Sequence, residues 1–168
     1  MSDDLWVLAA PFRAHVRRLL DQTGLPWPVV ALATGLSPAL IRNLLFGRDG
    51  RHRNRLPAPA ARALLALDAD RLLGQRRLWV SAEPTAITVT ELLATGCSPA
   101  ALARYCRLSE PELIGLLDAA LCTRLTELLV GAARLQWRRP LRPVAGQSVR
   151  TRPPRTAAGA PLAARASA

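Results

Sequence analysis

The chain has no lysine, few aromatic residues and few β-branched residues. Aromatic residues make up 4% of its 168 positions. The strands of β-sandwiches and barrels favour aromatic and β-branched residues, so this shortage argues against those folds. Half of the residues are apolar, and most of these are alanine or leucine, which suit helices. The composition therefore predicts an all-α fold with a helical core.

Acidic residues are few for the number of basic ones. All 23 basic residues are arginines, against 12 acidic residues, and the formal net charge is +11. A surplus of this size favours a polyanionic partner, either nucleic acid or the anionic face of a membrane. Codon bias in a GC-rich genome accounts for arginine in place of lysine, but not for the excess of arginine over acids.

Cysteine spacing and the first residues exclude further classes. The three cysteines, Cys97, Cys106 and Cys122, show no CxxC spacing and lie far from both histidines, so we predict no metal site and no cofactor. The chain opens with acids, and the apolar run at residues 5–10 is too short for a signal-peptide core or a membrane span. We therefore expect a cytoplasmic protein with reduced thiols.

An internal repeat divides the chain. The segment Leu5-Trp6-Val7-Leu8-Ala9-Ala10-Pro11 recurs as Leu78-Trp79-Val80-Ser81-Ala82-Glu83-Pro84, and Thr23-Gly24 and Leu36-Ser37 recur in order as Thr95-Gly96 and Leu108-Ser109. We interpret this series as a tandem duplication with unit 1 at residues 1–77 and unit 2 at 78–137. Residues 138–168 carry seven arginines and no acid, with many Pro and Ala, and are predicted to be a disordered basic tail.

Each unit is expected to contain about four short helices. Apolar periodicity, Ser-Pro starts and Gly stops place them at 11–23, 28–34, 37–46 and 57–67 in unit 1, and at 84–95, 99–106, 110–119 and 123–136 in unit 2. Trp6 and Trp79, at equivalent places before each unit, are expected to be core anchors. Trp27, between two prolines, is expected to staple the start of the second helix.

The segment Ala31 to Leu45 carries the clearest motif. Ala31 is small where two helices would cross, Gly35 permits a turn, Leu36 would plug that turn into the core, and Ile41 would pack the following helix. This segment resembles the helix-turn-helix motif of repressor-like DNA-binding proteins. The tandem arrangement is similar to that of uncharacterised actinobacterial and phage regulators.

The resemblance implies that helix 37–46 enters the major groove of DNA. Its outward residues would then contact bases: Pro38, Ala39, Arg42 and Asn43. Arg can pair with guanine, Asn with adenine, and Ala39 could touch a thymine methyl. Ser37 at the helix start and the arginines of the following loop would bind phosphates: Arg48, Arg51, Arg53 and Arg55. Arg13, Arg17 and Arg18 are weaker phosphate candidates. The alternative, that these residues form only a solvated charged face, stays open.

Unit 2 lacks the corresponding donors. Its turn residue is Arg107 in place of glycine, which is costly if the backbone there is left-handed. The equivalents of the base-contacting residues are Glu110, Pro111, Ile114 and Gly115, and unit 2 has a net charge of −2, against +6 for unit 1 and +7 for the tail. Unit 2 is therefore not expected to contact DNA, and a homodimer or a protein partner could use it instead.

The leading hypothesis is a transcriptional regulator that binds double-stranded DNA in the nucleoid. The alternative is a protein-interaction adaptor whose helix-turn-helix units are scaffolding, which would bind its partner in high salt and ignore DNA. Enzyme activity is not expected and no catalytic residue is assigned, because the acids are scattered and Tyr105, the only tyrosine, lies on a scaffold helix. Membrane binding is disfavoured because no amphipathic helix with Trp or Phe lies in the tail.

Overall fold

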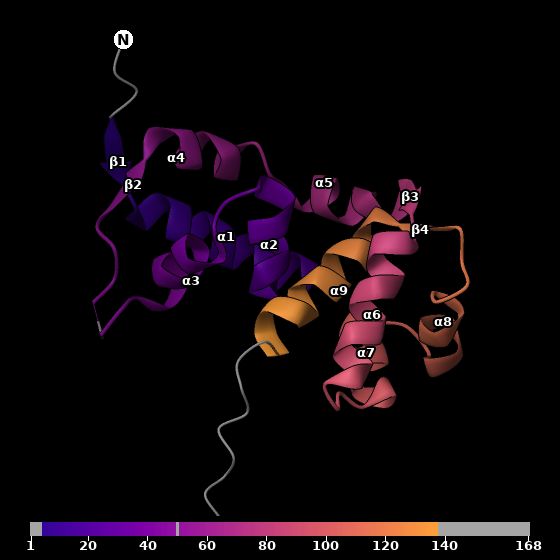
Figure 1. The fold of residues 1–168 in the computed structure, drawn as a ribbon. Coiled ribbons are helices and arrows are strands. Elements are labelled where there is room, and N and C mark those ends of the chain that lie inside the picture. Colours follow the sequence, from indigo (N-terminus) through magenta and orange to yellow (C-terminus); the bar gives the residue numbers. More distant parts are fainter. Residues whose placement is uncertain (1–4, 50, 138–168) are drawn as a thin grey trace, which may run out of the picture.

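The computed structural model describes residues 5–49 and 51–137 and is mostly helical (Figure 1). The first half of the described chain contains β1 (Trp6–Leu8), α1 (Ala10–Thr23), α2 (Trp27–Thr34), α3 (Pro38–Phe46), β2 (Arg55–Pro57), α4 (Ala58–Leu65), α5 (Ala69–Gly74) and the 3-10 helix η1 (Gln75–Arg77). The second half contains β3 (Trp79–Ser81), α6 (Glu83–Ala94), α7 (Pro99–Cys106), α8 (Glu110–Gly115), β4 (Leu121–Thr123) and α9 (Arg124–Trp137). None of these helices is long and apolar enough to cross a bilayer.

The prediction of an all-α fold is wrong in one respect, because short strands pair in both halves. β1 pairs antiparallel with β2, with Val7 opposite Leu56, and β3 pairs with β4, with Val80 opposite Cys122. Each strand is three residues long, so the pairs need few β-forming residues and composition does not reveal them. The order strand, three helices, strand, helix thus occurs in each half.

Local sequence features set most helix boundaries. The Ser37 hydroxyl accepts a hydrogen bond from the Leu40 backbone N–H at 3.2 Å and so caps α3. The preceding turn is made by Gly35, whose φ of 68° is left-handed and favours glycine. Ser109 and Glu112 form the expected capping box at the start of α8.

Other boundaries differ from the expectation. α8 ends at Gly115 rather than at residue 119, because residues 116–118 form turns. The helix expected over 57–67 spans Ala58–Leu65 and is followed by α5, which was not expected. The Asp68 side chain caps α5 by accepting from the Arg71 backbone N–H at 2.7 Å. Asp68 is therefore the N-cap signal for α5, which apolar periodicity alone does not reveal.

α9 connects the two halves of the described chain. It packs against α2 of the first half and against α6 and α7 of the second (Figure 1). Its inward residues are fully or almost fully buried: Leu128, Leu129, Val130, Ala132 and Ala133. A Cβ atom at Gly131 would lie 3.0 Å from Leu32 Cδ1, which shows how closely α9 approaches α2. The buried residues of both halves consequently form one cluster.

The expectation that Trp6 and Trp79 anchor the core is wrong. Their exposed fractions are 49% and 66%. In a short strand, alternate residues point to opposite sides, and here Val7 and Val80 turn inward while the tryptophans point to solvent. Trp27 behaves closer to expectation, since it is the first residue of α2 and its ring meets the Phe46 ring edge-on at 6.3 Å.

Arg107 has the left-handed backbone that makes a side chain costly at this turn, with φ of 59°. Its guanidinium Nη2 donates to the carbonyl oxygens of Thr23 and Gly24, at the end of α1. The residue that replaces the turn glycine in the second half therefore also ties that half to the first.

Candidate nucleic-acid interface

α3 presents one buried face and one open face. Ile41 and Leu44 are completely buried and Leu45 nearly so. Among the residues predicted to contact bases, Ala39 and Arg42 are exposed, and Pro38 and Asn43 are half-buried at the edges of the same face. All four thus lie on the side of α3 away from the core, as a helix of this pattern requires.

Three adjoining hollows follow the open face of α3. The first, of 350 Å³, is lined by Trp27, Pro38, Ala39, Arg42, Phe46, Leu135 and Gln136. The second, of 390 Å³, is lined by Ala39, Arg42, Asn43, Gly47, Arg48 and Asp49. The third, of 310 Å³, is lined by Asn43, Arg48, Arg51, His52 and Arg53. Because neighbouring hollows share two residues each, the face of α3 and the loop after it form one surface.

The structure brings most, but not all, of the predicted phosphate residues to this surface. Arg48, Arg51 and Arg53 lie beside Asn43. Arg55 is exposed on β2, opposite Leu8, and lines none of the three hollows. The Ser37 hydroxyl is already engaged in capping α3. We call residues 48–55 the arginine loop.

Backbone hydrogen bonds join two of the described residues of the arginine loop. Arg48 and Arg51 exchange two backbone hydrogen bonds, of 2.9 and 3.0 Å, and Asp49 has φ of 52°. Gly47 precedes the loop with φ of 76°, and a Cβ atom there would lie 2.7 Å from the Arg51 carbonyl oxygen. Only glycine fits that position, so Gly47 sets how the arginine loop folds back on the end of α3.

Two arginines of α1 form hydrogen bonds to the end of α3 and to the arginine loop. Arg13 donates from Nε to the Leu44 carbonyl at 2.8 Å and from Nη2 to the Arg53 carbonyl at 3.0 Å. Arg17 donates to the Leu45 carbonyl at 3.3 Å. Carbonyls at a helix C-terminus carry partial negative charge, so these guanidiniums stabilise the end of α3. Arg13 and Arg17 therefore position the surface, a role that the sequence did not suggest.

Trp6 supports one arginine of the loop. The Arg53 guanidinium carbon lies 5.7 Å from the centroid of the Trp6 ring, within the range of a cation–π contact. The pairing of β1 with β2 brings these residues together, and no local spacing links positions 6 and 53. The exposed Trp6 ring thus restrains the Arg53 side chain at the edge of the surface.

The end of α9 borders the other edge of the same surface. Leu135 and Gln136 line the first hollow beside Pro38 and Arg42. The Tyr105 hydroxyl donates to Gln136 Oε1 at 3.0 Å, and the Gln136 amide nitrogen has no partner among residues 5–49 and 51–137. Burial, with a smaller effect of Cys106, raises the pKa of Tyr105 to about 12, so the phenol stays protonated at neutral pH. Sequence reasoning missed Gln136, because only the tertiary fold brings α9 to α3.

The corresponding helix of the second half offers different chemistry. Glu110, Pro111, Ile114 and Gly115 are all exposed on α8, and none carries a cationic or amide side chain. Hydrogen bonds from the backbone and side chain of Ser109 lower the pKa of Glu112, so this exposed carboxyl is ionised at neutral pH. α8 therefore presents negative charge and apolar surface where α3 presents Arg and Asn.

No protein-family model, curated protein or solved structure matches this chain.

Proposed function

We propose that the protein is a transcriptional regulator that binds double-stranded DNA, with α3 in the major groove and the arginine loop along the phosphates. The observation that carries this proposal is the continuity of the surface. Asn43 and Arg48 line both of the hollows that join α3 to the arginine loop. Groups suited to base edges and groups suited to phosphates therefore lie side by side, as a helix-turn-helix protein requires.

Each part of the surface has a distinct task in this proposal. Arg42 donates to guanine, Asn43 pairs with adenine, and Ala39 lies against a thymine methyl. Arg48, Arg51 and Arg53 neutralise phosphates, which provides affinity and salt dependence with little sequence choice. The hydrogen bonds from Arg13 and the contact of Trp6 with Arg53 support this assignment. Cations that are already held in place lose less side-chain entropy on binding.

The two halves of the chain are proposed to be tandem helix-turn-helix units, of which the first contacts DNA. The repeated order of elements supports the duplication. The exposed acids of α8, Glu110 and Glu112, oppose contact with phosphate. The second unit would then buttress α2 through α9, and a palindromic site would require two copies of the chain.

A protein-interaction role for the second half is favoured by a separate observation. Large apolar side chains are exposed around β3, β4 and α8: Leu78, Trp79, Ile114, Leu117 and Leu121. Exposed apolar side chains of this size are typical of protein contacts. This role is compatible with DNA binding by the first half, and it becomes the sole function if DNA is not bound.

Selection from a random duplex library, followed by fluorescence anisotropy, tests the proposal. The native chain should enrich a consensus, and Arg42→Ala/Asn43→Ala should lose about 1–3 kcal/mol of discrimination per lost base contact. Salt-sensitive binding to any duplex should remain in that double variant. Arg104→Ala, an exposed arginine of α7 away from α3, is the control and should keep the consensus. Absence of any enriched site, together with unchanged binding of the double variant, would refute base contact by α3.

A further inference from the structure

A second cationic cavity lies at the junction of the two halves. This junction hollow, of 330 Å³, is formed by the end of α2, by α4, by the segment that includes α5 and η1, and by the start of α9. Its polar side chains are Thr34, Arg71, Gln75 and Arg124, and its apolar wall consists of Ala33, Ala63, Ala66, Leu67 and Leu128. It is separate from α3 and the arginine loop, which the proposed DNA contact uses.

Both arginines of the junction hollow have N–H donors that are not used in hydrogen bonds. Arg71 uses Nη1 to donate to the Ala66 carbonyl, and Arg124 uses Nη1 in an ion pair with Glu127. A guanidinium has five N–H donors, so each retains several that meet no partner among residues 5–49 and 51–137. Glu127 balances only one of the two charges. Both charged side chains that line the cavity are thus cationic, and both retain unused donors.

The other two polar side chains supply acceptors. The Thr34 hydroxyl donates to the Val30 carbonyl at 2.7 Å, so its oxygen can still accept a hydrogen bond. The Gln75 amide nitrogen donates to the Arg71 carbonyl at 3.1 Å, which leaves the amide oxygen as an acceptor. A ligand that satisfies the whole lining has anionic oxygens for the arginines and at least one hydroxyl group for the acceptors.

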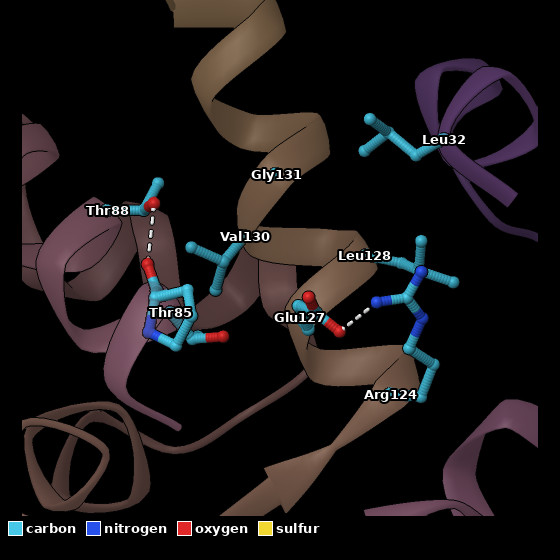
Figure 2. Close-up of a pocket in the computed structure, with 9 residues that line it drawn as sticks. Leu32, Thr85, Thr88, Arg124, Glu127, Leu128, Val130 and Gly131 are labelled. Carbon is cyan, nitrogen blue, oxygen red and sulfur yellow. Dashed lines mark hydrogen bonds and ion pairs between the residues drawn. The ribbon is translucent and has the colours of Figure 1, made fainter. Parts of the chain in front are cut away.

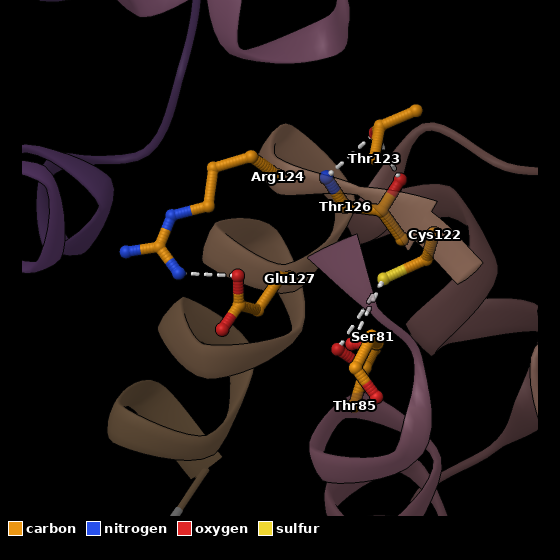
Figure 3. A network of polar contacts seen from close by, with 7 residues as sticks. All are labelled: Ser81, Thr85, Cys122, Thr123, Arg124, Thr126 and Glu127. Carbon is orange, nitrogen blue, oxygen red and sulfur yellow. Dashed lines mark hydrogen bonds and ion pairs between the residues drawn. The ribbon is translucent and has the colours of Figure 1, made fainter. Parts of the chain in front are cut away.

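Arg124 is held in place for such a role. The Thr123 hydroxyl accepts from the Thr126 backbone N–H at 3.2 Å and caps the first turn of α9 (Figure 3). Glu127, one turn along, fixes the Arg124 guanidinium beside the helix. A second hollow of 210 Å³ shares Arg124 and Leu128 with the junction hollow, and Leu32, Thr85 and Gly131 also line it (Figure 2). Arg124 therefore lines two cavities while its ion pair with Glu127 holds its guanidinium beside α9.

We propose that the junction hollow binds a compact oxyanion that carries a hydroxyl group, through the guanidiniums of Arg71 and Arg124. Carboxylate and phosphate oxygens both match the fork of a guanidinium, so a hydroxy acid and a sugar-type phosphate share the required chemistry. The ligand would link α5 of the first half to α9 of the second. It would also touch Thr34, the residue before the turn at Gly35, and so reach the helix-turn-helix without occupying its outer face. The proposal does not depend on DNA binding.

The test is a pair of NMR titrations of the full chain, one with malate and one with glycerol 3-phosphate, at constant ionic strength set with NaCl. Backbone amides near Thr34, Arg71, Gln75 and Arg124 should shift and saturate with at least one of the two anions. Arg71→Gln and Arg124→Gln should each weaken that binding about tenfold, the equivalent of one lost charge-assisted hydrogen bond. Arg71 is exposed, so the Arg71→Gln variant should retain the native thermal midpoint. It therefore tests the site even if Arg124→Gln does not fold.

Arg76→Gln is the matched control, because Arg76 is an exposed arginine of η1 that does not line the cavity. Equal weakening by Arg76→Gln and Arg71→Gln would show general electrostatic attraction and overturn the site. Shifts confined to the arginine loop, or no saturation with either anion, would overturn it as well. Succinate, which lacks the hydroxyl group of malate, should bind more weakly than malate, and equal binding of the two would overturn the role given to the hydroxyl group.

Discussion

At the scale of single residues, Gly47 and the arginines around it determine the shape of the candidate surface. Gly47 has no Cβ where the Arg51 carbonyl passes, and Arg13 donates hydrogen bonds to the carbonyl oxygens of Leu44 and Arg53. These are backbone constraints on the position of Arg48, Arg51 and Arg53. The chemistry of the surface therefore depends on residues that do not themselves need to touch DNA.

Gly47→Ala is expected to destabilise the chain by about 1–3 kcal/mol, since the added Cβ both strains a left-handed backbone and meets the Arg51 carbonyl. Thermal unfolding followed by circular dichroism measures the loss. Gly74→Ala is the control, because Gly74 lies in α5 with ordinary helical φ and open space around a Cβ. It should be neutral or slightly stabilising, by about 0.4–1 kcal/mol. Equal effects of both substitutions would contradict this role of Gly47.

Arg13 and Arg51 should differ in the salt dependence of DNA binding. Arg51→Gln removes a proposed phosphate contact and should reduce the slope of log K against log salt by about 0.9. Arg13→Gln removes hydrogen bonds to the Leu44 and Arg53 carbonyls, so it should lower the thermal midpoint and leave that slope nearly unchanged. Anisotropy titrations at stepped salt concentrations distinguish the two. A reduced slope for Arg13→Gln would assign Arg13 to phosphate instead.

Stability should fall at high pH because of the half-buried Tyr105 and the buried Cys106. Burial raises the pKa of Tyr105 to about 12 and, with a smaller effect of Cys97, raises that of Cys106 to about 12. The unfolded chain ionises these groups at lower pH, near 10 and 9, so it loses their protons first as pH rises. The stabilising effect is complete below pH 9 and is lost towards pH 12. Urea unfolding at pH 8, 10 and 11 should show this decline, and Tyr105→Phe should make it shallower.

At the scale of elements, α3 and α9 differ in how much of their structure could be predicted from the sequence. The bounds of α3 and its Ser37 cap followed from a Ser-Pro start and an apolar stripe, which are local features. α9 also lies close to its expected range, but its packing against α2 and the approach of Gln136 to Arg42 depend on tertiary structure. The strand pairs escaped prediction for the same reason, since three residues are too few to show a period. The exposure of Trp6 could not be predicted either, because it results from the pairing of β1 with β2.

Leu129→Ala in α9 should be strongly destabilising. Leu129 is one of the largest completely buried side chains, and truncating such a residue typically costs about 2–5 kcal/mol. Leu65→Ala, on the exposed side of α4, should change stability by less than about 0.5 kcal/mol. Chemical denaturation of both variants measures the contrast. Similar small effects would mean that the buried face of α9 does not stabilise the core.

For the whole molecule, one core spans both halves of the described chain. α9 lies between α2 and the helices α6 and α7, and Arg107 binds the end of α1 from across the junction. An arrangement of this kind should unfold cooperatively, although the order of elements recurs in the two halves. The expected basic tail at 138–168 lies outside the described residues, and it contributes to the account only through its charge of +7.

Differential scanning calorimetry tests that cooperativity. The 1–137 chain should show a single transition whose calorimetric and van't Hoff enthalpies agree. Leu129→Ala should shift this transition as a whole. Two separable transitions, one for each half, would contradict a shared core.

The most direct test of the central claim is the NMR footprint of a short DNA duplex on the full chain. Amides of α3 and the arginine loop, residues 37–55, should shift on addition of duplex, together with the Gln136 side-chain amide. Amides of α8 should remain in place, because its exposed carboxylates repel phosphate. Shifts centred on α8, or confined to residues 138–168, would contradict the assignment of α3 and the arginine loop as the DNA-binding surface.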